Sequence, residues 1–281
     1  MKIADSIESL TSTVKQWRKQ GLSIGFVPTM GNLHAGHIAL VNEARLKCDK
    51  VVASIFVNPL QFNEVDDFAA YPKTLQEDQQ KLVYAQVDLL FLPSSEEIYP
   101  EGQALISKVS VPALSDILEG ECRPGHFDGV ATVVNKLFNL VRPDIAFFGQ
   151  KDFQQLLVIQ KMVSDLCIPV QIFSVPTQRE EDGLAMSSRN SRLTPEQRGK
   201  AALLHKILRQ LTDELQSSPE SVAQLEQGAM LQLEKSGFQP EYVSLRHSSN
   251  LRPMSHLKRG SVLLAAARLG NVRLIDNLVL N

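Results

Sequence analysis

The sequence predicts an α/β protein in which a parallel sheet covered by helices is followed by a smaller domain of helices on a short antiparallel sheet. Short apolar runs alternate with amphipathic helical segments up to about residue 175, the order that builds a parallel sheet. After residue 190, two long helical segments precede three strand-like segments, an order typical of an α+β domain. The expected domains are therefore residues 1–175 and 176–281.

Composition limits the possible functions. The chain has 281 residues, is 43% hydrophobic and carries 29 basic against 31 acidic residues, with no Lys/Arg run, which argues against nucleic-acid binding through bulk charge. Cys48, Cys122 and Cys167 are far apart, so neither a disulfide framework nor a zinc site is indicated. No apolar stretch approaches the length of about 18 residues that spans a membrane. We expect a soluble, cytoplasmic protein without nucleic-acid or membrane partners.

The expected elements follow from hydrophobic periodicity. A helix is expected over residues 5–20, with Gly21 after its C-terminus. Strands are expected over residues 22–27, 51–57, 87–92, 144–148 and 168–175, with a further candidate strand over 104–111. Helices are expected from about residue 34, over 74–86, after a flexible segment 119–127, after residue 152, and over 195–215 and 219–236. Three strands over 241–247, 261–267 and 272–280 complete the second domain.

A strand-to-helix turn, residues 28–37 with the sequence Pro-Thr-Met-Gly-Asn-Leu-His-Ala-Gly-His, is the strongest functional signal. We call it the histidine turn. A helix beginning near His34 would direct unpaired N–H groups and a partial positive charge at a ligand above it. His34 and His37 share one face of the first helical turn, and Gly36 lets a ligand approach the backbone. The pattern favours a polyphosphate with a purine over the glycine; a pair of exposed histidines at a helix cap, or a weak metal site, are the alternatives.

Polar residues also follow the next strand, at the edge where open parallel sheets bind ligands. Asn58 and Gln61 come directly after the strand over 51–57. Ordinary turn chemistry beside Pro59 explains Asn58 well but explains Gln61 less well, because glutamine is not a favoured turn residue.

A second strand-to-helix turn contains Gly149, Gln150, Lys151 and Asp152. Lys151 is suited to a phosphate, and Asp152 is suited either to capping the helix or to holding a ribose; a helix cap beside a solvated lysine is the alternative. Gln155 lies one helical turn further on, facing the same way.

Met186-Ser187-Ser188-Arg189 offers two hydroxyls, their backbone amides and a guanidinium in sequence, which is the chemistry of a phosphate site. We call Ser187, Ser188 and Arg189 the phosphate clamp. A polar loop that caps the helix starting near Pro195 is the alternative. The second domain is expected to cover the site, with residues 186–190 at the hinge.

Acidic residues occur at two other places. Glu77 and Asp78 stand near the start of the helix over 74–86, where acids favour the helix dipole, a simpler explanation than a magnesium site. Asp66 and Asp67 belong to an expected surface loop over 63–73.

The histidine turn and the Met186–Arg189 segment together resemble the paired signatures of the nucleotidyltransferase superfamily, which includes class I aminoacyl-tRNA synthetases. The chain is more closely similar to the pantoate–β-alanine ligase family. The matching stretches occur in the family's order, over residues 26–37, 54–62, 123–135, 148–155 and 182–190. The resemblance implies a Rossmann-like doubly wound parallel sheet with a small C-terminal lid domain, usually in a homodimer.

The resemblance also implies residue roles. His34, His37, Lys151 and Arg189 would be catalytic, with His37 as the acid. Gln61 and Gln155 would bind pantoate, with Gln61 near the β-alanine position and Asn58 supporting it. ATP would be bound by Met30, Gly31, Asn32, Leu33, His34, Ala35, Gly36, His37, Gly149, Gln150, Lys151, Asp152, Gln178, Met186, Ser187, Ser188 and Arg189.

Two positions depart from the family pattern. Gln178 stands where the family often has a valine that touches adenine through its backbone. Lys81 stands where a further magnesium (Mg2+) ligand would follow Glu77 and Asp78. The protein's share of the magnesium site is therefore unassigned, and ATP phosphates and water are the other available ligands.

The implied reaction joins pantoate to β-alanine in two steps. Attack of the pantoate carboxylate on the α-phosphorus of ATP gives pantoyl adenylate and pyrophosphate, and the β-alanine amine then displaces AMP. An adenylyltransferase acting on a phosphorylated cofactor precursor is the main alternative, but it would need a basic pocket where this chain has Asn58, Gln61 and Gln155. A non-catalytic nucleotide- or RNA-binding descendant of a synthetase would have lost a catalytic position, and none is lost. A class I synthetase would need a tRNA-binding domain and a basic face, and the sequence indicates neither.

Overall fold

A computed structural model describes residues 1–63, 68–218 and 221–280, so Asp66 and Asp67 lie outside the described residues. The chain divides into two compact units. The first comprises Met1–Gln150 and Val158–Pro176, and the second comprises Lys151–Leu157 and Thr177–Asn281. Residues 151–157, which the sequence placed in the first domain, therefore group with the second unit.

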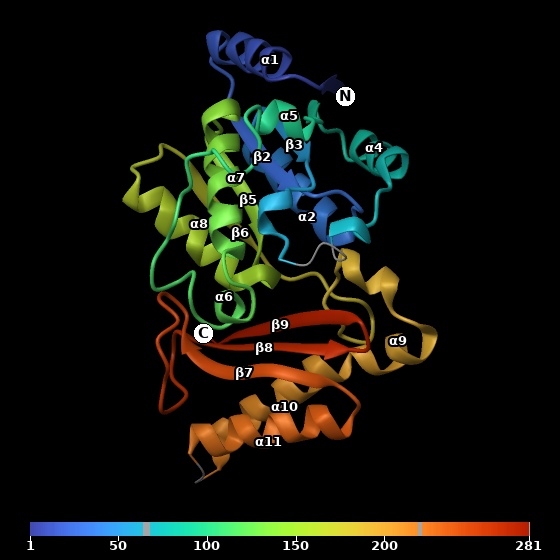
Figure 1. The fold of residues 1–281 in the computed structure, drawn as a ribbon, viewed down its shortest axis with the longest axis vertical. Coiled ribbons are helices and arrows are strands. Elements are labelled where there is room, and N and C mark those ends of the chain that lie inside the picture. The colour runs from blue at the N-terminus through green and yellow to red at the C-terminus, as the bar shows by residue number, and fades with distance from the viewer. Residues whose placement is uncertain (64–67, 219–220, 281) are drawn as a thin grey trace. The chain divides into compact units, whose positions relative to one another are not determined.

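A six-stranded parallel sheet forms the centre of the first unit, in the order β1-β4-β3-β2-β5-β6 (Figure 1). The order reverses next to β2, because the chain builds outward from β2 through β3 and then from β5 in the opposite direction. In such sheets the carboxyl ends of the strands beside the reversal border the ligand crevice. The strands are β1 (Lys2–Ala4), β2 (Ile24–Thr29), β3 (Lys50–Ile55), β4 (Leu89–Phe91), β5 (Ile145–Gly149) and β6 (Gln171–Val175).

Helices cover both faces of this sheet, as the doubly wound prediction requires. Val27 of β2 belongs to a core with Leu40 and Val41 of α2, whereas the neighbouring Phe26 packs edge-on against Phe138 of α7. Alternate residues of one strand thus bury opposite faces. The first unit contains α1 (Ile7–Lys19), α2 (Ala35–Lys47), η1 (Pro59–Gln61), α4 (Leu75–Tyr84), α5 (Ser95–Ile98), α6 (Glu119–Cys122) and α7 (His126–Val141), and η2 (Gln150–Asp152) and α8 (Phe153–Asp165) join β5 to β6.

The second unit packs helices on a three-stranded antiparallel sheet, as predicted. Its sheet has the order β7-β8-β9, with β7 (Gln239–His247), β8 (Ser261–Leu269) and β9 (Val272–Leu280). Apolar side chains of α10 (Leu203–Ser217) and α11 (Val222–Lys235) share one core with these strands. The helix expected over 195–215 is two helices, α9 (Pro195–Ala201) and α10, preceded by η3 (Ser188–Arg192).

The structure departs from the sequence analysis at three places in the first unit. Residues 104–111 form no strand, and the N–H of Val109 instead donates to Thr132 Oγ1 on α7 (2.9 Å). Strand β1 was missed because three residues are too short for a periodicity signal. The segment 119–127, predicted to be flexible, contains α6, and a Cβ at Gly120 would lie 1.8 Å from the carbonyl oxygen of Ser115. Local packing there is too close for a loose loop.

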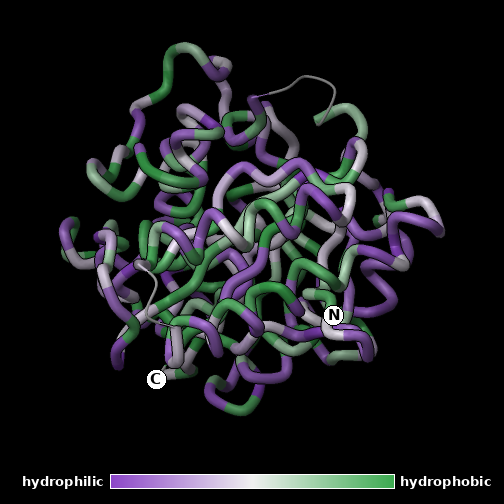
Figure 2. Tube along the Cα trace, turned by 90° about the horizontal axis from the view of Figure 1, so that it is seen from below, coloured by the Kyte–Doolittle hydropathy of each residue, from purple (hydrophilic) through white to green (hydrophobic). Residues whose placement is uncertain are grey.

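Amphipathic helices give the trace in Figure 2 its alternation of hydrophobic and hydrophilic residues. In the described part of the chain, no helix combines the length and the apolar character that crossing a membrane requires. Cys48 is half-buried, whereas Cys122 and Cys167 are exposed.

Candidate active site

The histidine turn follows β2 and depends on two residues with left-handed backbone. Gly31 has φ +82° and Asn32 has φ +48°, a region that glycine and asparagine enter more readily than other residues. A Cβ at Gly31 would also lie 3.1 Å from Ile55 Cγ2. The two left-handed residues reverse the chain between β2 and α2, so that α2 begins at Ala35, as predicted.

The two histidines of this turn cap helix α2 reciprocally. The N–H of Gly36 donates to His34 Nδ1 (3.2 Å), and the N–H of His34 donates to His37 Nδ1 (3.3 Å). The two rings lie with their centroids 4.1 Å apart. The first-turn N–H groups expected to be unpaired are therefore partly engaged by imidazole. Because each Nδ1 accepts a hydrogen bond, a neutral ring carries its proton on Nε2.

Asp78 is tied to the histidine turn, a contact that the sequence did not reveal. The residue is 1% exposed, and its carboxylate accepts hydrogen bonds from the N–H groups of Asn32 (2.8 Å) and Leu33 (2.7 Å). Lys81 Nζ, one helical turn along α4, donates to the carbonyl oxygen of Leu33 (2.8 Å). The proposed contribution to the helix dipole is therefore not the main role of Asp78.

The same contacts test whether these acids fit a magnesium ion. The Asp78 carboxylate is buried and engaged by backbone donors, and Lys81 on the same helix brings a cation rather than a further oxygen ligand. Among the residues that the structure describes, no group of three His, Cys, Asp or Glu side chains is arranged to hold a metal. The donor set at Asp78 does not fit a metal site.

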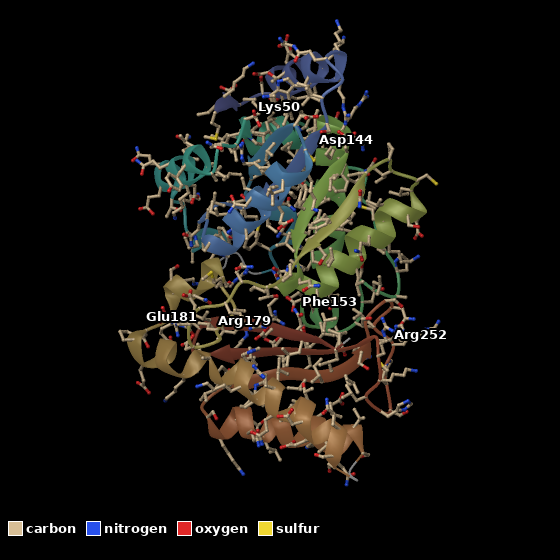
Figure 3. All side chains as sticks on the ribbon, turned by 180° about the vertical axis from the view of Figure 1, so that it is seen from behind. Lys50, Asp144, Phe153, Arg179, Glu181 and Arg252 are labelled. Atoms are coloured by element: carbon tan, nitrogen blue, oxygen red, sulfur yellow. The ribbon has the colours of Figure 1, made fainter. Side chains whose placement is uncertain are left out.

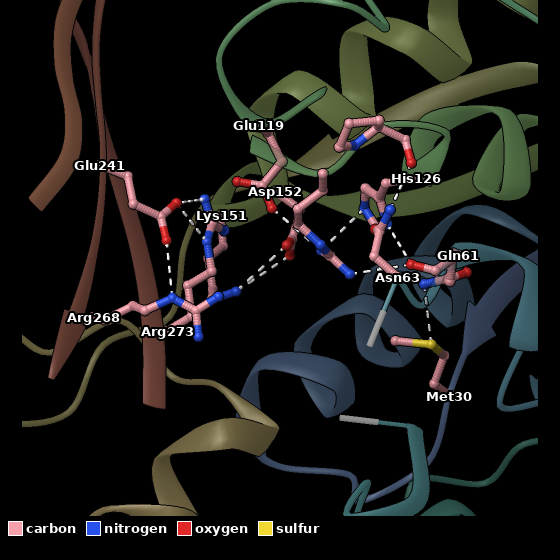
Figure 4. Close-up of polar contacts among 12 residues, drawn as sticks. Met30, Gln61, Asn63, Glu119, His126, Lys151, Asp152, Glu241, Arg268 and Arg273 are labelled. Carbon is pink, nitrogen blue, oxygen red and sulfur yellow. Dashed lines mark hydrogen bonds and ion pairs between the residues drawn. The ribbon is translucent and has the colours of Figure 1, made fainter. Parts of the chain in front are cut away.

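Gln61 is held beside the histidine turn by a chain of side-chain hydrogen bonds. Tyr99 Oη donates to Asn58 Oδ1 (2.8 Å), and Asn58 Nδ2 donates to Gln61 Oε1 (3.1 Å). Gln61 Nε2 then donates to Met30 Sδ (3.2 Å; Figure 4). Burial raises the pKa of Tyr99 well above its usual range, which keeps its hydroxyl a donor. This series of hydrogen bonds orients the side-chain amide of Gln61 so that its N–H groups lie on the side of Met30.

The backbone of Gln61 is fixed as firmly as its side chain. His126 Nδ1 donates to the carbonyl oxygen of Gln61 (2.8 Å), and Arg123 donates to the same oxygen (3.1 Å) and to Glu119 (3.2 Å; Figure 4). A Cβ at Gly129 would lie 2.5 Å from the carbonyl oxygen of Leu60, so η1 and α7 require glycine to approach this closely. Arg123 and His126 lie in the segment 119–127, for which the sequence predicted only flexibility.

In the second unit, Lys151 pairs with its neighbour, Asp152, at 3.4 Å. Asn277 Nδ2 of β9 donates to the carbonyl oxygen of Lys151 (2.9 Å) and so fixes its backbone. Gln155 lies half-buried on α8, in the same unit. Gly149 and Gln150 end the part of the first unit that precedes Lys151.

A buried carboxylate organises the residues next to Asn277. Arg179, labelled in Figure 3, makes a two-pronged ion pair with Asp276 (2.7 and 2.8 Å), and His205 Nδ1 lies 3.2 Å from Asp276 Oδ2. Burial opposes ionisation of Asp276, but hydrogen bonds from His205 and Arg179 outweigh it and lower the pKa of Asp276. No motif in the sequence pointed to these residues, because β9 and residue 179 are nearly a hundred positions apart.

The phosphate clamp adopts a compact local structure in the second unit. Ser187 Oγ accepts from the N–H of Arg189 (3.2 Å) and caps η3, while Thr194, not the clamp, caps α9. The N–H of Met186 donates to the carbonyl oxygen of Gln178 (2.9 Å), which brings Gln178 next to the clamp. The structure thus groups Met30, His34, His37, Asn58 and Gln61 in the first unit. It groups Lys151, Asp152, Gln155, Gln178 and Met186–Arg189 in the second unit.

Comparisons with known proteins agree across nearly the entire chain. The model of the family described as pantoate-beta-alanine ligase matches residues 2–279. A pantothenate synthetase of Pseudomonas putida is 52% identical over 281 residues, covering 100% of this chain and 98% of the relative. One of Thioalkalivibrio sulfidiphilus is 53% identical over 278 residues, covering 99% and 97%.

Solved structures give the same result. The pantothenate synthetase of Thermus thermophilus superposes with a TM-score of 0.91 at 45% identity, covering 99% of both chains. A pantoate-β-alanine ligase of Francisella tularensis, in complex with beta-gamma ATP and β-alanine, has a TM-score of 0.84 at 38% identity, covering 99% of this chain and 97% of that one. The fold and these likenesses agree, and the chain belongs to the pantoate–β-alanine ligase family.

Proposed function

We propose that this chain condenses (R)-pantoate with β-alanine to pantothenate, using ATP and releasing AMP and pyrophosphate. The observation that carries this proposal is the 3.2 Å contact of Gln61 Nε2 with Met30 Sδ. It sets a neutral amide donor, suited to a carboxylate or hydroxyl, directly beside the turn suited to a polyphosphate. A carboxylate and a triphosphate bound there are the two reactants of an adenylation.

The first step is attack by an oxygen of the pantoate carboxylate on the α-phosphorus of ATP. The bond from that phosphorus to the bridging oxygen breaks, and pyrophosphate leaves with the electron pair. Such a transfer depends on positioning and on donors around the phosphoryl oxygens. We assign this work to His34 and His37, in which Nδ1 accepts a backbone hydrogen bond and Nε2 is the nitrogen that can donate to a ligand.

Residues of the second unit complete the assignment. Lys151 and Arg189 would supply positive charge to the triphosphate, and Ser187 and Ser188 would donate to its oxygens. Met30–His37, Gly149, Gln150, Asp152, Gln178 and Met186 would contact the remainder of ATP. Gln155 would bind pantoate with Gln61, while Asn58 acts on Gln61 through the 3.1 Å hydrogen bond.

The second step forms the amide. The neutral amine of β-alanine attacks the acyl carbon of pantoyl adenylate, the bond from that carbon to the phosphate oxygen breaks, AMP leaves with the electron pair, and the nitrogen loses one proton to water. Neutral side-chain amides around pantoate suit the preceding adenylation step, in which the pantoate carboxylate is the nucleophile. A strong positive charge there would stabilise the carboxylate in the ground state rather than in the transition state.

Further expectations accompany the proposal. Magnesium would enter with ATP, held by phosphate oxygens and water, since Asp78 and Lys81 do not form a site for it. A cytoplasmic location and a homodimer stay predictions from the sequence. An adenylyltransferase acting on a phosphorylated precursor is not favoured, because Asn58, Gln61 and Gln155 are neutral where a second phosphate would need cations.

The experiment that tests this function measures AMP and pyrophosphate released from ATP, with pantoate alone and with pantoate plus β-alanine. We expect at most one turnover of pyrophosphate with pantoate alone, and sustained AMP release matched by pantothenate once β-alanine is added. Sustained turnover with a phosphorylated precursor, and none with pantoate, would replace this function by the adenylyltransferase.

A further inference from the structure

We infer that Asp78 and Lys81 are positioning residues of adenylation, which hold the backbone of the histidine turn in its phosphate-binding shape and bind no metal. The inference rests on the proposed role of the histidine turn in binding ATP. Both residues belong to helix α4, which contributes none of the proposed ligand contacts.

Asp78 and Lys81 make several hydrogen bonds to two successive residues of the histidine turn, Asn32 and Leu33. Asp78 Oδ2 accepts from the N–H of Asn32 (2.8 Å), and Oδ1 accepts from the N–H of Leu33 (2.7 Å). Thr74 Oγ1 adds a third donor to Oδ2 (3.2 Å), and Lys81 Nζ donates to the carbonyl oxygen of Leu33 (2.8 Å). One helix thus engages two successive N–H groups and the next carbonyl of the turn.

This part of the turn needs an external support because its backbone is unfavourable. Gly31 and Asn32 are both left-handed, and such a conformation costs a non-glycine residue energy unless its surroundings impose it. Two N–H groups that point the same way also repel each other. A buried carboxylate that accepts from both removes this repulsion, because hydrogen bonds to a charged acceptor are strong.

The position of the histidines depends on this segment. His34 follows Leu33 directly, and its N–H donates to His37 Nδ1 in the helix cap (3.3 Å). A shift of Leu33 therefore moves both imidazoles. A misplacement of about 1 Å costs on the order of 10²-fold in rate when the reaction depends on positioning. Asp78 and Lys81 thus act on the phosphoryl transfer through the histidines, without touching substrate.

Asp78→Asn is the sharpest test, because asparagine has the same shape but only one carbonyl oxygen. In either orientation its amide group confronts one of the two backbone N–H groups. We expect the single-turnover rate of pyrophosphate release to fall about 10²-fold. The concentrations of magnesium and of pantoate that give half-maximal rate should stay unchanged. Glu77→Gln, the adjacent but exposed carboxylate, is the matched control and should stay within two-fold of the unaltered chain.

Two further variants separate positioning from a general loss of structure. Lys81→Met keeps the length of the side chain but loses the donor to Leu33, and should lower the same rate with unchanged magnesium dependence. In the pair Asp78→Asn with His37→Ala, the second change should add little to the first, because both act through the imidazole.

Three results would overturn the inference. A raised magnesium requirement in Asp78→Asn would make Asp78 a metal ligand. If the effects of Asp78→Asn and His37→Ala on the single-turnover rate were fully additive, Asp78 would not act through the histidines. A chain that is slowed by His37→Ala but not by Asp78→Asn would leave the proposed function standing and remove the role of Asp78.

Discussion

Each histidine of the turn serves the fold with one ring nitrogen. Nδ1 of His34 and Nδ1 of His37 both accept backbone hydrogen bonds, so protonation of either ring at Nδ1 would break the cap. The cap therefore leaves Nε2 of each ring as the nitrogen that can donate to a ligand. A donor held in place by the cap suits a phosphoryl transfer, in which the transition state gains from preorganised donors to its oxygens.

His37→Ala should slow adenylate formation by on the order of 10²–10³, the usual loss for one preorganised donor to a transition state. The helix cap is weakened as well, at a cost of about 1 kcal/mol, so the chain should still fold. Rapid-quench measurement of pyrophosphate in a single turnover checks the rate, and circular dichroism checks the fold. His256→Ala, an exposed histidine of the second unit, is the control. An unchanged single-turnover rate in His37→Ala would refute this role.

Gln61→Ala should weaken pantoate binding and leave ATP affinity nearly unchanged. The reason is that its Nε2 is the donor proposed for pantoate, while its contact with the ATP-binding turn is only the weak one to Met30 Sδ. Losing one such hydrogen bond corresponds to about 1 kcal/mol, or roughly five-fold in the dissociation constant. Titration calorimetry with each ligand separately measures both effects.

Tyr99→Phe tests the same chain of hydrogen bonds from its buried end. It removes the hydroxyl that orients Asn58 and leaves the ring in place. A smaller loss of pantoate affinity than in Gln61→Ala is expected, again with ATP unaffected. Equal losses for both ligands in either variant would show that the residue supports the fold instead.

The strands and helices show which parts of the structure a sequence can predict. The central strands, the histidine turn and the antiparallel sheet were predicted because long apolar runs and helical periodicity are local signals. Strand β1 and helix α6 were missed because they have three and four residues. Residues 104–111 resemble a strand in composition but have their backbone bonded to a helix side chain, which no local pattern reveals.

The same limit applies to the candidate site. Its motif residues stand close together in sequence, whereas their supports do not. Asp78 acts on Asn32 from 46 positions away, and Tyr99 acts on Asn58 from 41 positions away. Such contacts are decided by which helices the sheet brings together, and single-sequence periodicity carries no information about that.

Strand β9 carries a prediction about pH. Asp276 has a lowered pKa in the folded chain, so it binds a proton less readily there than in the unfolded chain. Its contribution to stability is therefore complete above the unfolded value, about 3.9, and is lost as the pH falls through the lower folded value. Asp276→Asn should destabilise the second unit by about 3 kcal/mol at pH 7, the lower end for removing one partner of a buried ion pair.

Calorimetric unfolding of both chains between pH 7 and pH 3 tests this prediction. The difference between the chains should be constant down to about pH 4 and shrink below it. Asp213→Asn, an exposed residue on α10, should leave stability unchanged. The single tryptophan, Trp17, lies in the first unit, so its fluorescence reports that unit separately. A difference that persists to pH 3 would contradict the assignment to Asp276.

The proposed ATP ligands belong to both units of the chain. The histidine turn belongs to the first unit, and the phosphate clamp belongs to the second. A ligand favours whichever state gives it more contacts, so ATP that engages both sets would link the two units thermodynamically. The lid that the sequence predicts would follow from this linkage and would also keep water away from the adenylate.

Arg189→Ala tests that linkage. Removing the guanidinium should weaken ATP binding by about 1.5–3 kcal/mol, the usual range for a hydrogen bond to a charged group. Poorer exclusion of water should let part of the adenylate hydrolyse, so that more than one AMP is released for each pantothenate formed. The ratio of AMP to pantothenate at saturating substrates measures this leak. Arg192→Ala, at the far end of the same 3-10 helix, is the control. A ratio that stays at one while ATP affinity falls would show that Arg189 binds phosphate without helping to exclude water.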